Sequence, residues 1–245
     1  MRVFGRSDIG LKRKSNQDCF YSAKVNESAL WAVVCDGMGG VNGGDVASNL
    51  AVKSIKESLS NGTWKELGEI QSSDVKKMLK NALKKANLEI FTNAQDNKNL
   101  AGMGTTAVLV AVVNDKIHVA HVGDSRAYLV RQGKINQLTI DHSMVQEMID
   151  EGEITHEEAK MHPNKNIITR ALGISKDVDV DYSMKTKKAG DAVIICTDGL
   201  TNYLDQKEIL DYFKVEKGEA FVDGLISAAN ERGGADNITV VALCE

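Results

Sequence analysis

The stretch Trp31-Ala-Val-Val-Cys-Asp36-Gly37-Met38-Gly39-Gly40-Val-Asn-Gly43-Gly44-Asp45 decides the fold, because a short apolar run ends there at an acid and a glycine-rich segment follows. The run 31–35 predicts a buried strand, since it is short, apolar and contains two adjacent valines. Asp36 is then expected where the strand leaves the core, beside glycines that let other groups approach the backbone closely. A carboxylate next to bare carbonyls suits Mg²⁺ or Mn²⁺, although an Asp-Gly pair alone is also a common turn.

Three other kinds of site do not fit this stretch. Gly39 and Gly44 have the spacing of a phosphate-binding P-loop, but Asp45 and Val46 stand where a lysine and a hydroxyl residue are required. A calcium-binding EF-hand loop needs oxygen ligands at alternating positions, and Met38 breaks that pattern. A phosphatase with an aspartyl nucleophile would usually carry a second acid two residues after the first, and Met38 stands there instead.

Composition predicts one soluble domain spanning 1–245. The chain has 245 residues, 42% hydrophobic residues and a single proline, so it can build a sizeable core and offers no obvious linker. A net charge of −4 and a pI near 5.8 argue against a nucleic-acid partner. No apolar run approaches the ~20 residues that span a membrane, and the N-terminus lacks a signal peptide's apolar core. We therefore expect a cytoplasmic protein with no membrane or nucleic-acid partner, and a monomer.

The cysteines and histidines show no metal-binding spacing. No Cys-x-x-Cys or His-x-x-x-His pair occurs among the four cysteines and five histidines. Buried free thiols in a reducing compartment are expected, and a zinc site is not.

The periodicity of apolar residues predicts an α+β fold, with a central antiparallel β-sandwich flanked by pairs of helices in four layers, αββα. A weakly apolar segment at 152–170, which holds the only proline, is expected to form a surface flap. Strands are expected at 3–8, 19–21, 29–35, 105–113, 116–122, 127–130, 178–184, 192–196 and 238–243, and helices at 45–60, 73–94, 142–152, 205–213 and 219–231.

One pattern recurs along the chain. Asp36, Asp198 and Asp236 each stand at a junction between an apolar strand and a glycine-bearing loop, and Asp18 and Asp124 are placed similarly. Each acid alone is more often a turn or cap residue. If the strand ends converge, however, several carboxylates would crowd together, and a divalent cation would remove the cost of that repulsion.

With these residues the chain resembles the metal-dependent serine/threonine protein phosphatases of type 2C, in particular their short bacterial single-domain members. The resemblance covers essentially the whole chain. Its motifs, in family order, are Arg13-x-x-Asn16-Gln17-Asp18, Asp36-Gly37-Met38-Gly39-Gly40, Gly102-Met-Gly104-Thr105-Thr106, Gly123-Asp124-Ser125-Arg126, Asp198-Gly199-Leu200 and Gly234-Ala-Asp236-Asn237.

The resemblance implies a centre of two Mn²⁺ or Mg²⁺ ions per chain. Asp36 would bridge the two ions, the Gly37 carbonyl would bind one of them, and Asp198 and Asp236 would complete the other. Asp124 would hold a third, weaker metal ion together with Asp198.

Three further residues receive roles by the same resemblance. Asp18 would accept hydrogen bonds from metal-bound water, Arg13 would hold the substrate phosphate, and Asn237 would orient Asp236 or a water molecule. The flap at 152–170 would influence substrate access.

The implied reaction is hydrolysis of phosphoserine and phosphothreonine in proteins, opposing a Ser/Thr protein kinase. A metal-bridging water or hydroxide would attack phosphorus directly, without a phosphoenzyme. Many eukaryotic members carry a histidine, proposed to be the general acid, where this chain has Met38. Two alternatives stay open at this stage, a catalytically inactive binding module and a phosphohydrolase of nucleotides or small molecules.

Overall fold

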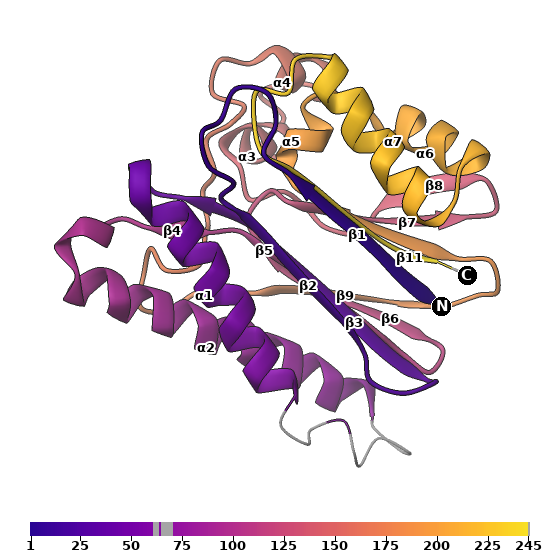
Figure 1. Cartoon of the computed structure of the whole chain (residues 1–245), viewed down its shortest axis with the longest axis horizontal. Coiled ribbons are helices and arrows are strands. Elements are labelled where there is room, and N and C mark those ends of the chain that lie inside the picture. The colour runs from indigo at the N-terminus through magenta and orange to yellow at the C-terminus, as the bar shows by residue number, and fades with distance from the viewer. Residues whose placement is uncertain (61–63, 65–70, 245) are drawn as a thin grey trace.

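The structure is a computed structural model of the chain, in which residues 1–60, 64 and 71–244 are described, without the side chains of residues 40–42. Two antiparallel sheets form its centre, and Figure 1 shows helices covering the outer face of each. The expected α+β sandwich with flanking helices is therefore confirmed. No helix in the described part of the chain is both long enough and apolar enough to cross a membrane.

The first sheet has the strand order β1-β11-β10-β7-β8, and the second has the order β2-β3-β5-β6-β9, with β4 paired to β3. The strands are β1 (Arg2–Asp8), β2 (Asp18–Lys24), β3 (Ala29–Met38), β4 (Gly104–Thr105), β5 (Ala107–Val113), β6 (Lys116–Val122), β7 (Arg126–Arg131), β8 (Lys134–Gln137), β9 (Asp181–Thr186), β10 (Ala192–Cys196) and β11 (Ile238–Cys244).

Helices α1 and α2 cover the second sheet, and α6 and α7 cover the first (Figure 1). The helices are α1 (Gly40–Ser60), α2 (Ser72–Asp96), the 3₁₀ helix η2 (Lys98–Leu100), α3 (Met144–Asp150), α4 (His156–Met161), α5 (Asp198–Thr201), α6 (Gln206–Val215) and α7 (Gly218–Glu231).

Successive side chains of β3 point to opposite faces of its sheet, and this alternation explains the apolar layers of the fold. Trp31 and Val33 face the helices α1 and α2, whereas Ala32 and Val34 face the other sheet. Three apolar layers result, one between the sheets and one under each helix pair. At the next even position, Asp36 therefore continues the row of β3 that faces the space between the sheets.

Several expected boundaries were wrong. β3 does not end before Asp36 but continues to Met38, because Gly37 and Met38 pair with β4. Helix α1 begins at Gly40, five residues before the expected start at Asp45. Strand β8 and helix α5 were not expected, and the segment 142–152 is helical only over Met144–Asp150.

Candidate metal centre and active site

Asp18 and Asp36 lie directly opposite each other on β2 and β3. Both continue strand rows that face the space between the sheets, at the end of the sandwich where α5 begins (Figure 1). The Oγ1 of Thr106 accepts a hydrogen bond from the Asp36 N–H at 3.0 Å, and the Asp36 carbonyl accepts from the Thr106 N–H at 2.8 Å. The backbone that carries Asp36 is thus fixed on both sides.

Asp18 is held by hydroxyl groups of the other sheet. Its Oδ2 accepts from Thr239 Oγ1 at 2.7 Å and from Thr197 Oγ1 at 2.9 Å, and all three residues are buried. Its Oδ1 is buried without a partner among the described residues. A buried carboxylate oxygen that lacks a donor fits a role as acceptor for a water molecule in the site.

Two further acids come from the first sheet. Asp198 opens α5 directly after β10, and Asp236 lies two residues before β11, so the antiparallel pairing of these strands brings both to the same end. The Asp198 carboxyl lies near that of Asp36, whose pKa it helps to raise, and accepts from Asn202 Nδ2 at 3.1 Å. Asp124 joins them from the loop after β6.

Burial and mutual repulsion raise the pKa of these carboxyl groups. Burial is the main cause for Asp18 and Asp124, whose pKa values rise to about 7, and neighbouring acids add to it. Burial and then Asp18 raise the pKa of Asp36 well above its usual range. Burial followed by Asp236 raises the pKa of Asp198. Such a cluster costs free energy whenever it is fully ionised, and a bound divalent cation would offset that cost.

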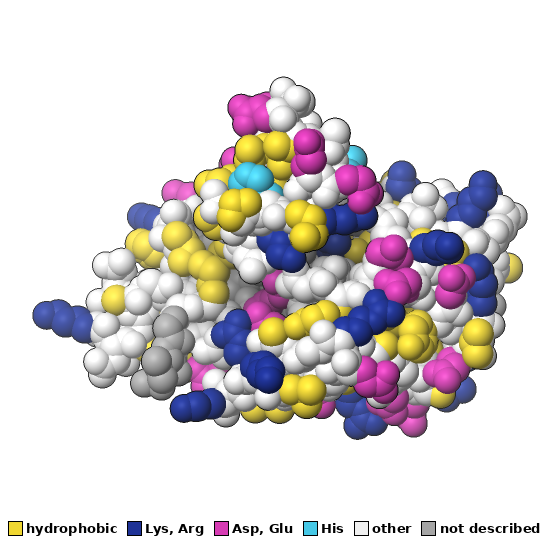
Figure 2. Space-filling model, turned by 90° about the horizontal axis from the view of Figure 1, so that it is seen from above, with side chains coloured by type: hydrophobic (Ala, Val, Ile, Leu, Met, Phe, Trp, Pro, Cys, Tyr) yellow, Lys and Arg dark blue, Asp and Glu magenta, His cyan; other side chains and the backbone are white. Residues whose placement is uncertain are grey.

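Four of the acids, all except Asp18, line one open cavity of about 580 Å³, with Arg13 and Gly37 also in its wall. In Figure 2 acidic side chains lie at the bottom of a hollow, and Lys and Arg side chains surround its rim. Arg13 Nη2 donates to Asp236 Oδ2 at 2.7 Å, and about half of the Arg13 side chain is exposed. The cavity thus combines oxygen ligands at its floor with a guanidinium at its edge.

Gly37 is packed too tightly for any side chain. A Cβ there would lie 2.0 Å from the Gly44 carbonyl oxygen and 2.6 Å from that of Gln17. The glycines at the start of α1 therefore let the helix lie directly against the strand that carries Asp36.

Asn237 contacts both Asp236 and the loop before β2. Its backbone N–H donates to Asp236 Oδ1 at 2.8 Å, but its buried side chain binds the loop before β2. Oδ1 accepts from the Gln17 N–H at 2.8 Å, and Nδ2 donates to the carbonyls of Ile9 and Ser15 at 2.9 and 3.0 Å. Asn237 therefore fixes the loop that carries Arg13.

Asn237→Ala should lower the free energy of unfolding by about 2–4 kcal/mol, because it removes a buried side chain and leaves three partly buried backbone groups of that loop without their partner. Urea denaturation followed by circular dichroism measures the change. Asn99→Ala, at an exposed position of η2, is the control and should change stability by less than about 0.5 kcal/mol. Equal effects of the two substitutions would contradict the assigned role.

The segment 152–170 contributes Asn166 and Ile168 to the wall of the same cavity. A capping box lies near its start, with Thr155 and Glu158 bonded reciprocally before α4. A larger groove of about 850 Å³ continues from the acids between this segment and the start of α6, and Asn166 lines both spaces.

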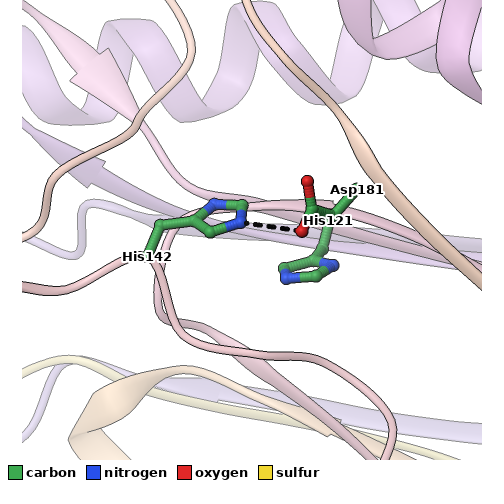
Figure 3. Close-up of side chains that lie close together, drawn as sticks. All are labelled: His121, His142 and Asp181. Atoms are coloured by element: carbon green, nitrogen blue, oxygen red, sulfur yellow. Dashed lines mark ion pairs between the residues drawn. The ribbon is translucent and has the colours of Figure 1, made fainter. Parts of the chain in front are cut away.

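A second polar cluster, which no sequence pattern indicates, combines His121, His142 and Asp181. One potential ligand atom of each lies within 4.8 Å of the others (Figure 3). Arg170 also belongs to this cluster, because its Nη1 lies 2.9 Å from Asp181 Oδ1 and 3.1 Å from His142 Nε2. A guanidinium at that distance opposes a metal cation, so these residues fit an ion-paired network better than a metal site.

A sandwich that gathers carboxylates from both sheets around one cavity, with an arginine at the rim, defines a metal-dependent phosphohydrolase. Comparisons narrow the class. Residues 5–239 match the model of the family described as Protein phosphatase 2C. The chain therefore belongs to the protein phosphatase 2C family, whose members use Mn²⁺ or Mg²⁺.

Individual relatives agree with this assignment. The serine/threonine phosphatase stp of Listeria welshimeri is 37% identical over 238 residues, which are 96% of this chain and 92% of the relative. The structure of a Streptococcus agalactiae serine/threonine phosphatase superposes with a TM-score of 0.90 at 36% identity, covering 100% of this chain and 99% of the other. The catalytic domain of PstP, solved in complex with two manganese ions, gives a TM-score of 0.82 at 32% identity, with coverage of 98% and 96%.

Proposed function

We propose that this chain hydrolyses phosphoserine and phosphothreonine in proteins, with Asp36, Gly37, Asp198 and Asp236 holding a pair of Mn²⁺ or Mg²⁺ ions. One observation carries the proposal. Carboxyl groups from four separate strand ends, those of Asp36, Asp124, Asp198 and Asp236, line a single cavity, and burial together with neighbouring acids raises the pKa values of the first three. The donors are all oxygen atoms, which suits these two ions.

Bound ions supply an acidified water near neutral pH and offset negative charge on the phosphoryl oxygens. The protein's own groups do the rest. Arg13 offers a guanidinium fork to the phosphate at the rim of the cavity. The unpartnered Oδ1 of Asp18 accepts a proton or a hydrogen bond from water in the site, while Thr197 and Thr239 keep the carboxylate in place.

Asp124, beside Asp198 in the cavity, supports a third and weaker metal site. Met38 also lines the cavity, and a thioether carries no proton to donate, so the leaving alkoxide must be protonated by another group. Water in the cavity next to Asp124 is the candidate. The flap 152–170 contributes to substrate access through Asn166 and Ile168.

Residues 1–245 act as a single catalytic domain in this proposal. It works as a monomer in the cytoplasm, opposing a Ser/Thr protein kinase. The free thiols of all four cysteines support a reducing compartment. Exposed lysines along the groove beside the site, Lys165 and Lys207 among them, are compatible with a phosphorylated protein partner.

Turnover of a phosphothreonine peptide should stop in EDTA and return with Mn²⁺, because the acids cannot hold the phosphate without cations. Release of inorganic phosphate measures it. The control repeats the EDTA and Mn²⁺ measurements with a nucleoside triphosphate as substrate. The kcat/KM for the peptide should exceed that for the nucleotide by about 100-fold. Turnover that is unaffected by EDTA would refute the proposal. Metal binding without turnover of any phosphate ester would also refute it, because it would indicate a catalytically inactive binding module.

A further inference from the structure

The loop that carries Asp124 is held by one histidine. His142 brackets Gly123, since its backbone N–H donates to the Gly123 carbonyl at 3.0 Å and its Nδ1 accepts from the Gly123 N–H at 3.0 Å. Gly123 has φ +104°, and a Cβ there would lie 2.6 Å from Thr106. The conformation of the residue before Asp124 is thus set by these contacts.

The contact with Gly123 fixes where the imidazole carries its proton. Nδ1 accepts a hydrogen bond and so has no proton, and the neutral ring must then be protonated at Nε2. Burial is the main reason that the pKa of His142 falls to about 4, which keeps the ring neutral at ordinary pH.

Asp181 and Arg170 surround the opposite side of the ring. Figure 3 shows His142 Nε2 directed at the Asp181 carboxylate, with a separation of 3.4 Å from Oδ2. Arg170 Nη1 donates to Asp181 Oδ1 at 2.9 Å and lies 3.1 Å from His142 Nε2. Two N–H groups that meet in this way need the shared carboxylate as acceptor. Without it, the guanidinium would favour the ring form whose Nε2 is unprotonated and can accept.

The same histidine joins the flap to the Asp124 loop. The His142 carbonyl accepts from the Thr169 N–H at 2.9 Å, and Met144 N–H donates to the Ile167 carbonyl at 2.9 Å. The intervening Ile168 and its neighbour Asn166 line the cavity together with Asp124. A shift of the His142 backbone, which the side-chain contact with Gly123 helps to fix, would therefore reach both walls of the site.

We propose that His142 is a positioning residue, held in its Nε2–H tautomer by Gly123 and by Asp181, which Arg170 keeps in place, and that this tautomer places Asp124 and the flap residues 166–168 in the active site. The inference rests on the proposed function in one respect, the role of Asp124 as a ligand of the third metal ion. The tautomer itself does not depend on that role, so the two can fail separately.

A pair of substitutions at His142 tests the proposal. The amide oxygen of asparagine can replace Nδ1 as the acceptor for Gly123, whereas glutamine places its amide near the position of Nε2. His142→Asn should retain most of the turnover of p-nitrophenyl phosphate. His142→Gln should lower that turnover about 10-fold or more and raise the Mn²⁺ concentration for half-maximal turnover about 10-fold.

His118 provides the matched control. It is a buried histidine on β6 whose Nδ1 lies 2.7 Å from Tyr182 Oη, away from the cavity. His118→Asn and His118→Gln should leave the Mn²⁺ dependence unchanged. If His142→Gln and His142→Asn give the same Mn²⁺ dependence, the proposal is overturned.

A second measurement needs no activity and no metal. In ¹H–¹⁵N spectra of the imidazole groups of the metal-free protein, His142 should show a proton on Nε2 and none on Nδ1. Asp181→Ala should move the proton to Nδ1 and impair Mn²⁺-dependent turnover, whereas Asp181→Asn, which keeps an acceptor oxygen, should change both less. Asp181 is partly exposed, so these variants should fold even where His142→Gln does not. A wild-type ring protonated on Nδ1, or an unchanged tautomer in Asp181→Ala, would refute the inference.

Discussion

Asparagine in place of Asp36 should lower the turnover of p-nitrophenyl phosphate by about 1000-fold or more, the scale of losing a member of an interdependent catalytic unit. Asp36 stands at the centre of the cluster, since burial and four other acids raise the pKa of its carboxyl. The amide keeps the shape of the side chain but removes the charge that a bridging metal ligand needs. Steady-state kinetics at saturating Mn²⁺ measure the loss.

The same substitution should stabilise the metal-free fold, because it removes an ionisable group from a crowded, buried position. Thermal unfolding in EDTA should therefore give a melting temperature at least equal to that of the wild type. Asp211→Asn, at an exposed position of α6 where Asp211 pairs with Lys214, is the control and should alter neither property. Normal turnover by a folded Asp36→Asn protein would refute the assignment of the metal centre.

The positions of these acids were predictable for a physical reason. Asp36, Asp198 and Asp236 follow or precede runs of apolar residues whose length and composition give strands, and glycines next to them signal close backbone approach. The order of the motifs then ties the three together. Sequence periodicity could not show that Asp36 lies inside β3, because the extension to Met38 depends on pairing with the two-residue strand β4.

The contacts that could not be predicted from the sequence depend on how segments far apart in the chain pair with one another. Thr197 and Thr239 carry no motif of their own, and they reach Asp18 only because β10 and β11 pair side by side. His121 and His142 likewise meet through the fold, with ring centroids 4.8 Å apart. The early start of α1 ran against the low helix propensity of glycine, which close packing against β3 outweighs here.

Added Mn²⁺ should raise the melting temperature by about 5–10 °C for each ion bound at 100 times its dissociation constant, and the increase should grow from pH 6.5 to pH 8.0. Asp18 and Asp124 have pKa values near 7 in the metal-free fold, far above those of the unfolded chain. The folded state therefore binds more protons than the unfolded state in this range, and its stability falls as the pH rises through 7. Metal binding requires ionised carboxylates and releases those protons.

Between pH 6.5 and pH 8.0 the effect of the clustered carboxyl groups can be separated from that of the buried histidines. Burial lowers the pKa values of His118 and His142 to about 4, so their stabilising contribution is complete above about pH 6.5 and is lost only on acidification. Scanning calorimetry in EDTA and in MnCl₂ at several pH values measures the increase in melting temperature that Mn²⁺ causes at each pH. Asp36→Asn should reduce it and Asp211→Asn should not, since only the first removes a carboxylate from the cluster. A metal-induced increase that is the same at pH 6.5 and pH 8.0 would mean that the ions bind elsewhere, because only the clustered carboxyl groups link binding to proton release in this range.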